Sequence, residues 1–372
     1  MRILHTLAER SLGGLEFRVL EQSGWLHGHG YEVAIAAPAD SEISCVARQR
    51  GLRTVDLDFS RAYSPSTILK LRRAVKALRI DVIDSHSRAD GKTAALCRDL
   101  CAVVRTRHFA KSMRSSPRRR LEWKIGCDHV IATSHKGKHE ILAAGLAADE
   151  RISVVGEWAA DEFFLREEDP HARLRTRQAL GIDAPEDACV IATIGMLRPE
   201  KGQADLLRVV QRLRGLGLPA TALVVGMPTA STQSYGQALH QLAADLGIVR
   251  HTIFAGHRNN VSEMIRAADV ILVPSATEAW SRIVPEAYAA GRPVVASEVG
   301  GLPEIVAPGL TGWLAPPGDI AGFADHIMQI RSQPERAGIL VANARAYAET
   351  NFRLAGKMFS TLEAYKRTLA GG

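Results

Sequence analysis

The stretch PSATEAWSRIVPEAYAAGRPVVASEVGGLPE, residues 274–304, decides the fold of the second half of the chain. It follows the apolar run VILV, residues 270–273, which is typical of a buried parallel strand. A loop over 274–280 leads into a helix that we expect from about 281 to 290, because Gly291 and Pro293 cannot continue it. A strand at 294–296 and a glycine turn at 299–303 complete a strand–helix–strand unit.

Two carboxylates stand out in this unit, Glu278 in the loop and Glu286 eight positions later in the helix. They follow a strand, and ligands of open α/β sheets bind at the carboxyl ends of strands. The unpaired donors expected at the helix start are the amides of Trp280, Ser281, Arg282 and Ile283. The unit therefore offers carboxylates for hydroxyls and N–H groups for an anion, as a sugar nucleotide requires. The alternative is an ordinary pair of solvated glutamates.

The chain length predicts two domains, since 372 residues exceed one ordinary core. Apolar strands alternate with helical patterns in both halves, which indicates doubly wound parallel sheets. We expect one Rossmann-like domain over residues 1–165 and a second over 166–351, with the charged stretch REEDP, residues 166–170, as the linker. The last amphipathic stretch, 352–369, is expected to be helical.

The net charge of +7 favours polyanionic partners, namely nucleic acid, nucleotide diphosphates or an anionic membrane surface. No apolar run reaches transmembrane length, and the N-terminus lacks the apolar region of a signal peptide. We therefore expect a cytoplasmic protein. The five cysteines show no C-x-x-C spacing, which argues against a disulfide framework or a zinc site.

Much of the positive charge lies in KSMRSSPRRRLEWK, residues 111–124, which begin with Lys111 and end with Lys124. This stretch holds six Lys or Arg residues and one acid. It is either a mobile, solvated loop or a surface that docks to anionic lipid or to an anionic saccharide acceptor. The stretch is too short and too interrupted by Ser and Pro for base readout, so we expect no nucleic-acid partner.

Two nucleotide motifs are absent or incomplete. Residues 86–93, HSRADGKT, contain only the second half of a Walker A loop, because His86 stands where its first glycine belongs. His86 ends a strand and could still face a ligand cleft. No G-x-G-x-x-G follows any expected strand, which argues against an NAD enzyme.

A second candidate site lies in the loop GMLRPEKG, residues 195–202, which follows the expected strand at 190–194. Arg198 and Lys201 place two cations at a strand end, where they suit a diphosphate whose departure builds negative charge. The alternative is a surface pair that uses Glu200 as its ion partner.

Both candidate sites resemble those of glycosyltransferase family 4, retaining enzymes of the GT-B fold. The 274–304 stretch is similar to that family's E-x7-E region, from the strand through Glu278, Glu286 and the glycine turn. The 195–202 loop resembles its G-R-x-x-x-x-K-G element, here with Met196 and Leu197 before Arg198. One departure is Ser281, where many members have glycine.

The resemblance implies roles for single residues. Arg198 and Lys201 would hold the leaving nucleoside diphosphate with the Gly195 loop, Glu278 would bind hydroxyls of the donor sugar and Glu286 the ribose. His108, at the end of a strand, would lie under the donor sugar. Gly13 and Gly14 would approach the diphosphate or acceptor by backbone, and the final helix would cross back onto the first domain.

The sequence thus predicts a hexosyltransferase that uses a UDP- or GDP-sugar and a saccharide or lipid-linked acceptor in lipopolysaccharide, capsule or exopolysaccharide biosynthesis. Its catalytic residues would be His108, Arg198, Lys201 and Glu278. We expect no cofactor and no essential metal, because no Asp-x-Asp pair accompanies the cations. Two alternatives stay open: a sugar-nucleotide epimerase on the same fold, and a non-catalytic glycan- or nucleotide-binding scaffold.

Overall fold

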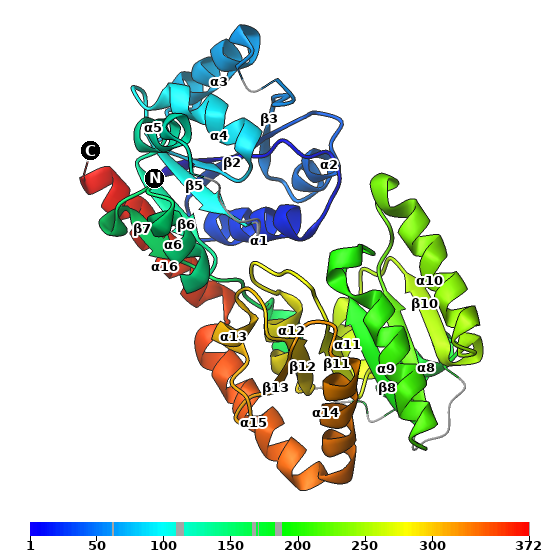
Figure 1. Cartoon of the computed structure of the whole chain (residues 1–372). Helices are drawn as coiled ribbons and strands as arrows, with labels where there is room; N and C mark the ends of the chain where they lie inside the picture. The colour runs from blue at the N-terminus through cyan, green and yellow to red at the C-terminus, as the bar shows by residue number, and fades with distance from the viewer. Residues whose placement is uncertain (62, 109–114, 166–168, 170, 183–187, 372) are drawn as a thin grey trace. The chain divides into compact units, whose positions relative to one another are not determined.

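The computed structural model describes residues 1–61, 63–108, 115–165, 169, 171–182 and 188–371 (Figure 1). It divides into two compact units, one formed by Met1–Glu157 with Leu354–Gly372 and the other by Trp158–Arg353. Each unit is a parallel sheet with helices on both faces, which confirms the predicted fold class of two Rossmann-like domains.

The first unit contains a seven-stranded parallel sheet in the order β3-β2-β1-β4-β5-β6-β7. Its strands are β1 Arg2–Thr6, β2 Glu32–Ala37, β3 Arg53–Asp56, β4 Val82–Ser85, β5 Ala102–Arg107, β6 His129–Ala132 and β7 Ile152–Val154. Its α-helices are α1 Gly14–Gly28, α2 Glu42–Gln49, α3 Pro65–Leu78, α4 Arg88–Ala94, α5 Pro117–Gly126, α6 His135–Ala143 and α16 Leu354–Ala370. Every residue of β4 and of β6 is buried, because helices cover both faces of the sheet.

The last helix, α16, belongs to the first unit although it is the C-terminal element of the chain (red in Figure 1). It packs on α1, β5 and β6. Leu362 and Tyr365 are buried in one cluster with Ile3, Val82 and Ile131 from the central strands. This apolar face explains why the helix returns to the N-terminal sheet.

The second unit contains a six-stranded parallel sheet in the order β10-β9-β8-β11-β12-β13. Its strands are β8 Cys189–Ile194, β9 Ala220–Val225, β10 Thr252–Gly256, β11 Val270–Val273, β12 Val294–Ser297 and β13 Trp313–Ala315. Its α-helices are α7 Asp161–Phe164, α8 Ala172–Ala179, α9 Gln203–Gly215, α10 Gln233–Asp245, α11 Val261–Ala267, α12 Ile283–Ala289, α13 Leu302–Ile305, α14 Ile320–Ser332 and α15 Pro334–Asn351. The sheet order makes β8 and β11 direct neighbours, although 75 residues separate Ile194 from Val270.

Two boundaries differ from the sequence-based expectation. The division falls between Glu157 and Trp158 rather than at 165, because Phe163 and Phe164 are buried in a core cluster of the second unit. Helix α12 begins at Ile283 rather than near 281. The cause is Pro285, which has no N–H to donate to the carbonyl four residues earlier. In a helix that begins at Ile283, Pro285 is the third residue, where no N–H has a partner within the helix, so no helical hydrogen bond is lost.

The basic stretch 111–124 is also not simply a loop. Its first four residues lie outside the described residues, but the remainder runs into α5. Ser116 caps this helix by accepting a hydrogen bond from the Arg119 amide, and Pro117 occupies the first turn. Both are helix-start signals that the charge pattern obscured. Among the described helices none is long and apolar enough to cross a membrane.

Candidate active site

In the second unit the loops that follow β8 and β11 are joined by an ion pair. Lys201 Nζ lies 2.6 Å from Glu278 Oε2, and the Ser275 hydroxyl lies 3.4 Å from the same oxygen. The Ala276 amide donates to the Glu200 carbonyl at 2.9 Å, so the two loops are also joined by backbone. The adjacency of β8 and β11 brings together residues that are 77 positions apart in the chain.

Glycines allow this close approach. Gly202 has φ +72°, and a Cβ there would lie 2.1 Å from the Pro274 carbonyl oxygen. Gly300 has φ +59°, and a Cβ there would lie 1.5 Å from the Glu278 carbonyl oxygen. Both positions therefore require glycine for conformation and for space. The turn after β12 thus supports the backbone of Glu278, and the start of α9 abuts the start of the 274–282 loop.

The Gly195 turn is held in the same way. The Gly195 amide donates to the Val225 carbonyl at 2.9 Å, and a Cβ on Gly226 would lie 1.9 Å from the Gly195 carbonyl oxygen. Gly195 itself, at φ +150°, has open space where a Cβ would be. A ligand could therefore approach this backbone closely.

The cations of this loop differ in their surroundings. Arg198 is half-exposed, and its guanidinium pairs with no carboxylate among the described residues. Lys201, whose side chain is 36% exposed, pairs with the buried Glu278. Lys201 is also the only lysine between residues 158 and 353. Among the described residues, the loop thus presents one cation paired with a carboxylate and one without a carboxylate partner at the carboxyl edge of β8, and both cations suit a phosphate group.

Glu286 lies one helical turn into α12 and is buried. Arg282, the residue before the helix, donates from Nη2 to Glu286 Oε1 at 3.3 Å, which orients the carboxylate. Trp280 is buried too, with its ring packed edge-on against Phe352 at 5.5 Å between centroids. Trp280 and Ser281 lie in the loop before α12, so only Ile283 belongs to the helical first turn that the sequence predicted.

The first unit contains a buried chain of three imidazoles at the ends of adjacent strands. His5 Nδ1 lies 3.0 Å from His86 Nε2, and His86 Nδ1 lies 3.1 Å from His108 Nε2. The strand order β1-β4-β5 aligns the three side chains. His86 is 1% exposed, so the expectation that it could face a cleft is wrong; it connects His5 to His108 instead.

The histidine chain is neutral near pH 7. Burial, helped by the neighbouring His86, lowers the pKa of His5 to about 3. Burial also lowers the pKa values of His86 and His108. A neutral imidazole has one donor and one acceptor nitrogen. Glu157 Oε1 lies 3.9 Å from His108 Nδ1 and favours a proton on that nitrogen, which leaves His108 Nε2 as an acceptor. His86 then donates from Nδ1 to His108, and His5 donates from Nδ1 to His86.

Buried polar groups surround this chain. Asp84 accepts hydrogen bonds from Thr106 at 2.7 Å and from the Tyr365 hydroxyl of α16 at 2.6 Å. Arg18, 1% exposed, pairs with Glu157 at 2.7 Å. Sequence reasoning found neither His5 nor Asp84, because single polar residues in apolar strands carry no spacing signal.

His5, Asp84 and His86 each place one possible metal-ligand atom within 4.8 Å of the others. Two of these atoms already hydrogen bond each other, and the Asp84 oxygen already accepts the Tyr365 hydroxyl. These groups are therefore engaged in a hydrogen-bonded network, in which the buried His5 Nε2 is left without a hydrogen-bond partner among the described residues. The expectation that the enzyme needs no metal stays a prediction.

Gly13 and Gly14 start α1 in the first unit. The Gly13 amide donates to the Glu16 carboxylate at 2.8 Å, so this donor is used in capping the helix. Gly14 is the first helical residue and has open space where a Cβ would be. A ligand therefore has room to approach Gly14, whereas the Gly13 amide is already used by the helix cap.

Two Rossmann-like parallel-sheet units, one with cations and carboxylates joined at the carboxyl edge of its sheet, define a GT-B glycosyltransferase. The family model described as "Glycosyl transferases group 1" matches residues 175–347, and that described as "Glycosyltransferase Family 4" matches residues 12–157. D-inositol 3-phosphate glycosyltransferase of Saccharomonospora viridis is 31% identical over 78% of this chain and 70% of its own length.

Solved structures share the fold. A glycosyltransferase from Rickettsia africae superimposes with a TM-score of 0.88 at 19% identity, covering 100% of this chain and 99% of its own. Anabaena HepE, solved in complex with UDP and glucose, superimposes with a TM-score of 0.84 at 21% identity, covering 98% and 99%. The chain belongs to the group 1 glycosyltransferases of the family 4 type, and it is a glycosyltransferase.

Proposed function

We propose that this enzyme is a retaining hexosyltransferase that uses a UDP- or GDP-sugar as donor and a saccharide or lipid-linked hydroxyl as acceptor. The observation that carries the proposal is the contact of Lys201 with Glu278, which unites the cationic loop after β8 with the carboxylate loop after β11. A nucleotide sugar needs both: positive charge for the diphosphate and carboxylates for the hydroxyls on either side of it.

Each residue then has a defined task. Arg198 and Lys201 neutralise the charge that develops on the departing diphosphate, and preorganised charge of this kind is often the largest catalytic term. Glu278, held by Lys201 and Ser275, accepts hydroxyls of the donor sugar, and Glu286 accepts those of the ribose. In the first unit His108, held neutral by burial, lies at a strand end under the expected donor sugar, with its two ring nitrogens turned to His86 and Glu157.

The donor proposal draws support from HepE, which was solved with UDP and glucose. For the acceptor, the name of the Saccharomonospora relative points to a phosphorylated cyclitol. The Saccharomonospora relative gives no support to an envelope-polysaccharide pathway, which rests only on the sequence-based expectation. The cytoplasmic location and the absence of an essential metal are proposed on the same basis.

The proposal is tested by acceptor-dependent release of UDP or GDP from a panel of donor sugars. We expect Lys201→Met and Glu286→Gln each to lower turnover at least about 100-fold, the scale of losing one preorganised charge contact. Matched controls are Glu335→Gln and Arg336→Met, both exposed on α15. All four proteins should keep the wild-type circular dichroism spectrum.

Undiminished turnover in both site variants would remove the assignment. A sugar-nucleotide isomer formed without acceptor, detected by NMR, would indicate an epimerase instead. The anomeric coupling constant of the product tests retention of configuration.

A further inference from the structure

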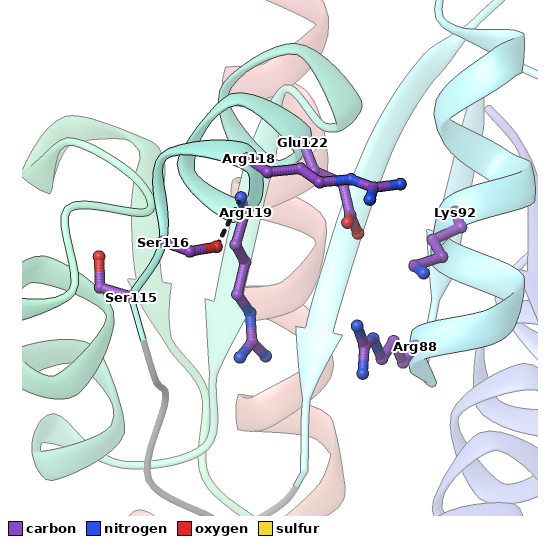
Figure 2. Close-up of a pocket in the computed structure, with 7 residues that line it drawn as sticks. All are labelled: Arg88, Lys92, Ser115, Ser116, Arg118, Arg119 and Glu122. Carbon is purple, nitrogen blue, oxygen red and sulfur yellow. Dashed lines mark hydrogen bonds between the residues drawn. The ribbon is translucent and has the colours of Figure 1, made fainter.

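A cavity of about 390 Å³ lies in the first unit between the segments that follow β4 and β5. Arg88 and Lys92 enter it from one face of α4, and Arg118 and Arg119 enter it from the first turn of α5 (Figure 2). The remaining lining residues are Ser115, Ser116 and Glu122. Lys92 belongs to the incomplete Walker motif, whose Gly-Lys-Thr run lies inside α4 rather than in a phosphate loop.

The described residues that line this cavity carry a net positive charge. Four cations and one carboxylate leave three positive charges, counting Arg88, Lys92, Arg118, Arg119 and Glu122. Among the described residues no carboxylate forms an ion pair with Arg88, Lys92 or Arg118; Lys92 lies over the Tyr63 ring, 5.2 Å from its centroid. Glu122 is shared with Arg105, 3.8 Å away. Converging like charges repel, so an anion in the cavity would relieve the repulsion.

The donors suit a phosphate group better than a single carboxylate. Arginine guanidinium groups bind phosphate through two parallel N–H bonds, and three excess charges exceed what one carboxylate neutralises. Ser116 accepts the Arg119 amide at 3.2 Å, which leaves its hydroxyl hydrogen to donate. The Ser115 hydroxyl is already used, since it donates to the Ala144 carbonyl at 2.9 Å.

The position links the cavity to the reaction. Arg88 lies two residues after His86, which hydrogen bonds His108 at the end of β5. The cavity therefore opens at the same edge of the sheet as the imidazole chain. Its cations also converge from two helices on a hollow, whereas a bilayer would favour cations spread over one outward face.

We propose that this cavity binds a phosphate group carried by the acceptor, so that Arg88, Lys92, Arg118 and Arg119 select phosphorylated acceptors. This inference rests on the proposed function, because only a glycosyltransferase has an acceptor to select. The phosphate-binding step can be measured without any transfer.

The test titrates full-length protein, saturated with UDP to fill the donor site, with myo-inositol 3-phosphate, myo-inositol and inorganic phosphate by calorimetry. We expect the phosphate monoester to bind and myo-inositol not to bind. The double variant Arg88→Gln/Lys92→Gln should weaken the monoester at least tenfold. The matched control is Lys70→Gln/Arg73→Gln on exposed positions of α3, which removes the same charge from the same unit and should stay within twofold of wild type.

Absence of binding by wild type at millimolar monoester, or equal affinity in the two double variants, would overturn the proposal. The proposal would also fail if the Arg88→Gln/Lys92→Gln variant kept its affinity for the monoester but lost its preference for phosphatidylglycerol vesicles over phosphatidylcholine vesicles. That result would make the surface a membrane contact. The UDP affinity of the same proteins reports separately on the donor site. If neither UDP nor GDP binds, the proposed function fails, while the monoester comparison, run without nucleotide, still decides whether the cavity binds phosphate.

Discussion

Substitution of Gly300 by alanine should disable the donor site through the backbone of Glu278. The new Cβ would lie 1.5 Å from the Glu278 carbonyl oxygen and 2.6 Å from its carbonyl carbon. Real Cβ atoms essentially never come closer than 3.0 Å to another heavy atom, so the two segments must separate by about 1.5 Å. Glu278 would then move away from Lys201, its partner at 2.6 Å.

A displacement of about 1 Å in a positioned catalytic group can cost about 100-fold in rate, so we expect turnover to fall at least about 100-fold. Stability should fall as well, since a side chain in the left-handed region costs about 1–2 kcal/mol before any clash is counted. The assay is acceptor-dependent release of nucleoside diphosphate, with UDP affinity measured by calorimetry and the melting temperature by circular dichroism.

The matched control is Gly247→Ala. Gly247 has φ +68°, close to the φ +59° of Gly300, but nothing lies within 4 Å of its Cβ position, and it precedes β10 at the amino edge of the sheet. It should show the backbone strain alone, a loss of about 2–8 °C in melting temperature for a unit of this size, with turnover unchanged. Turnover of Gly300→Ala within threefold of the control would refute the claim that this turn positions Glu278.

The histidine chain and the metal expectation each give a further prediction. The free energy of unfolding of wild type, relative to that of His5→Gln, should fall by about 2 kcal/mol between pH 7.5 and pH 5, as measured by urea unfolding. The reason is that buried His5, with a pKa of about 3, stays neutral in the folded protein, whereas in the unfolded chain it gains a proton below about pH 6.5. Burial raises the pKa of Asp90 to about 6, an effect of opposite sign that is common to both proteins and cancels. A difference that does not change with pH would contradict a buried, neutral His5. Transfer activity should survive EDTA, and activity that returns only on adding Mg²⁺, Mn²⁺ or Zn²⁺ would show that a metal is required.

The strands and helices around the donor site follow from the sequence because their signals are local. The apolar run before Pro274, the glycine and proline after α12, and the glycine pair at 300–301 each act within a few residues. The same local rules placed Arg198, Lys201 and Glu278 at strand ends. Two further local signals changed the outcome: Pro285 moved the start of α12 from about 281 to Ile283, and Ser116 caps a helix where a loop or docking surface was expected.

The sequence by itself therefore determined the two parallel sheets and the positions of the candidate donor residues at strand ends. Only the tertiary structure decided that Lys201 pairs with Glu278, that His5, His86 and His108 form one chain, and that α4 and α5 enclose a cationic cavity. The reason is the order of strands in each sheet. Parallel strands that are neighbours in space are distant in sequence, so no local pattern reveals which loop ends will meet.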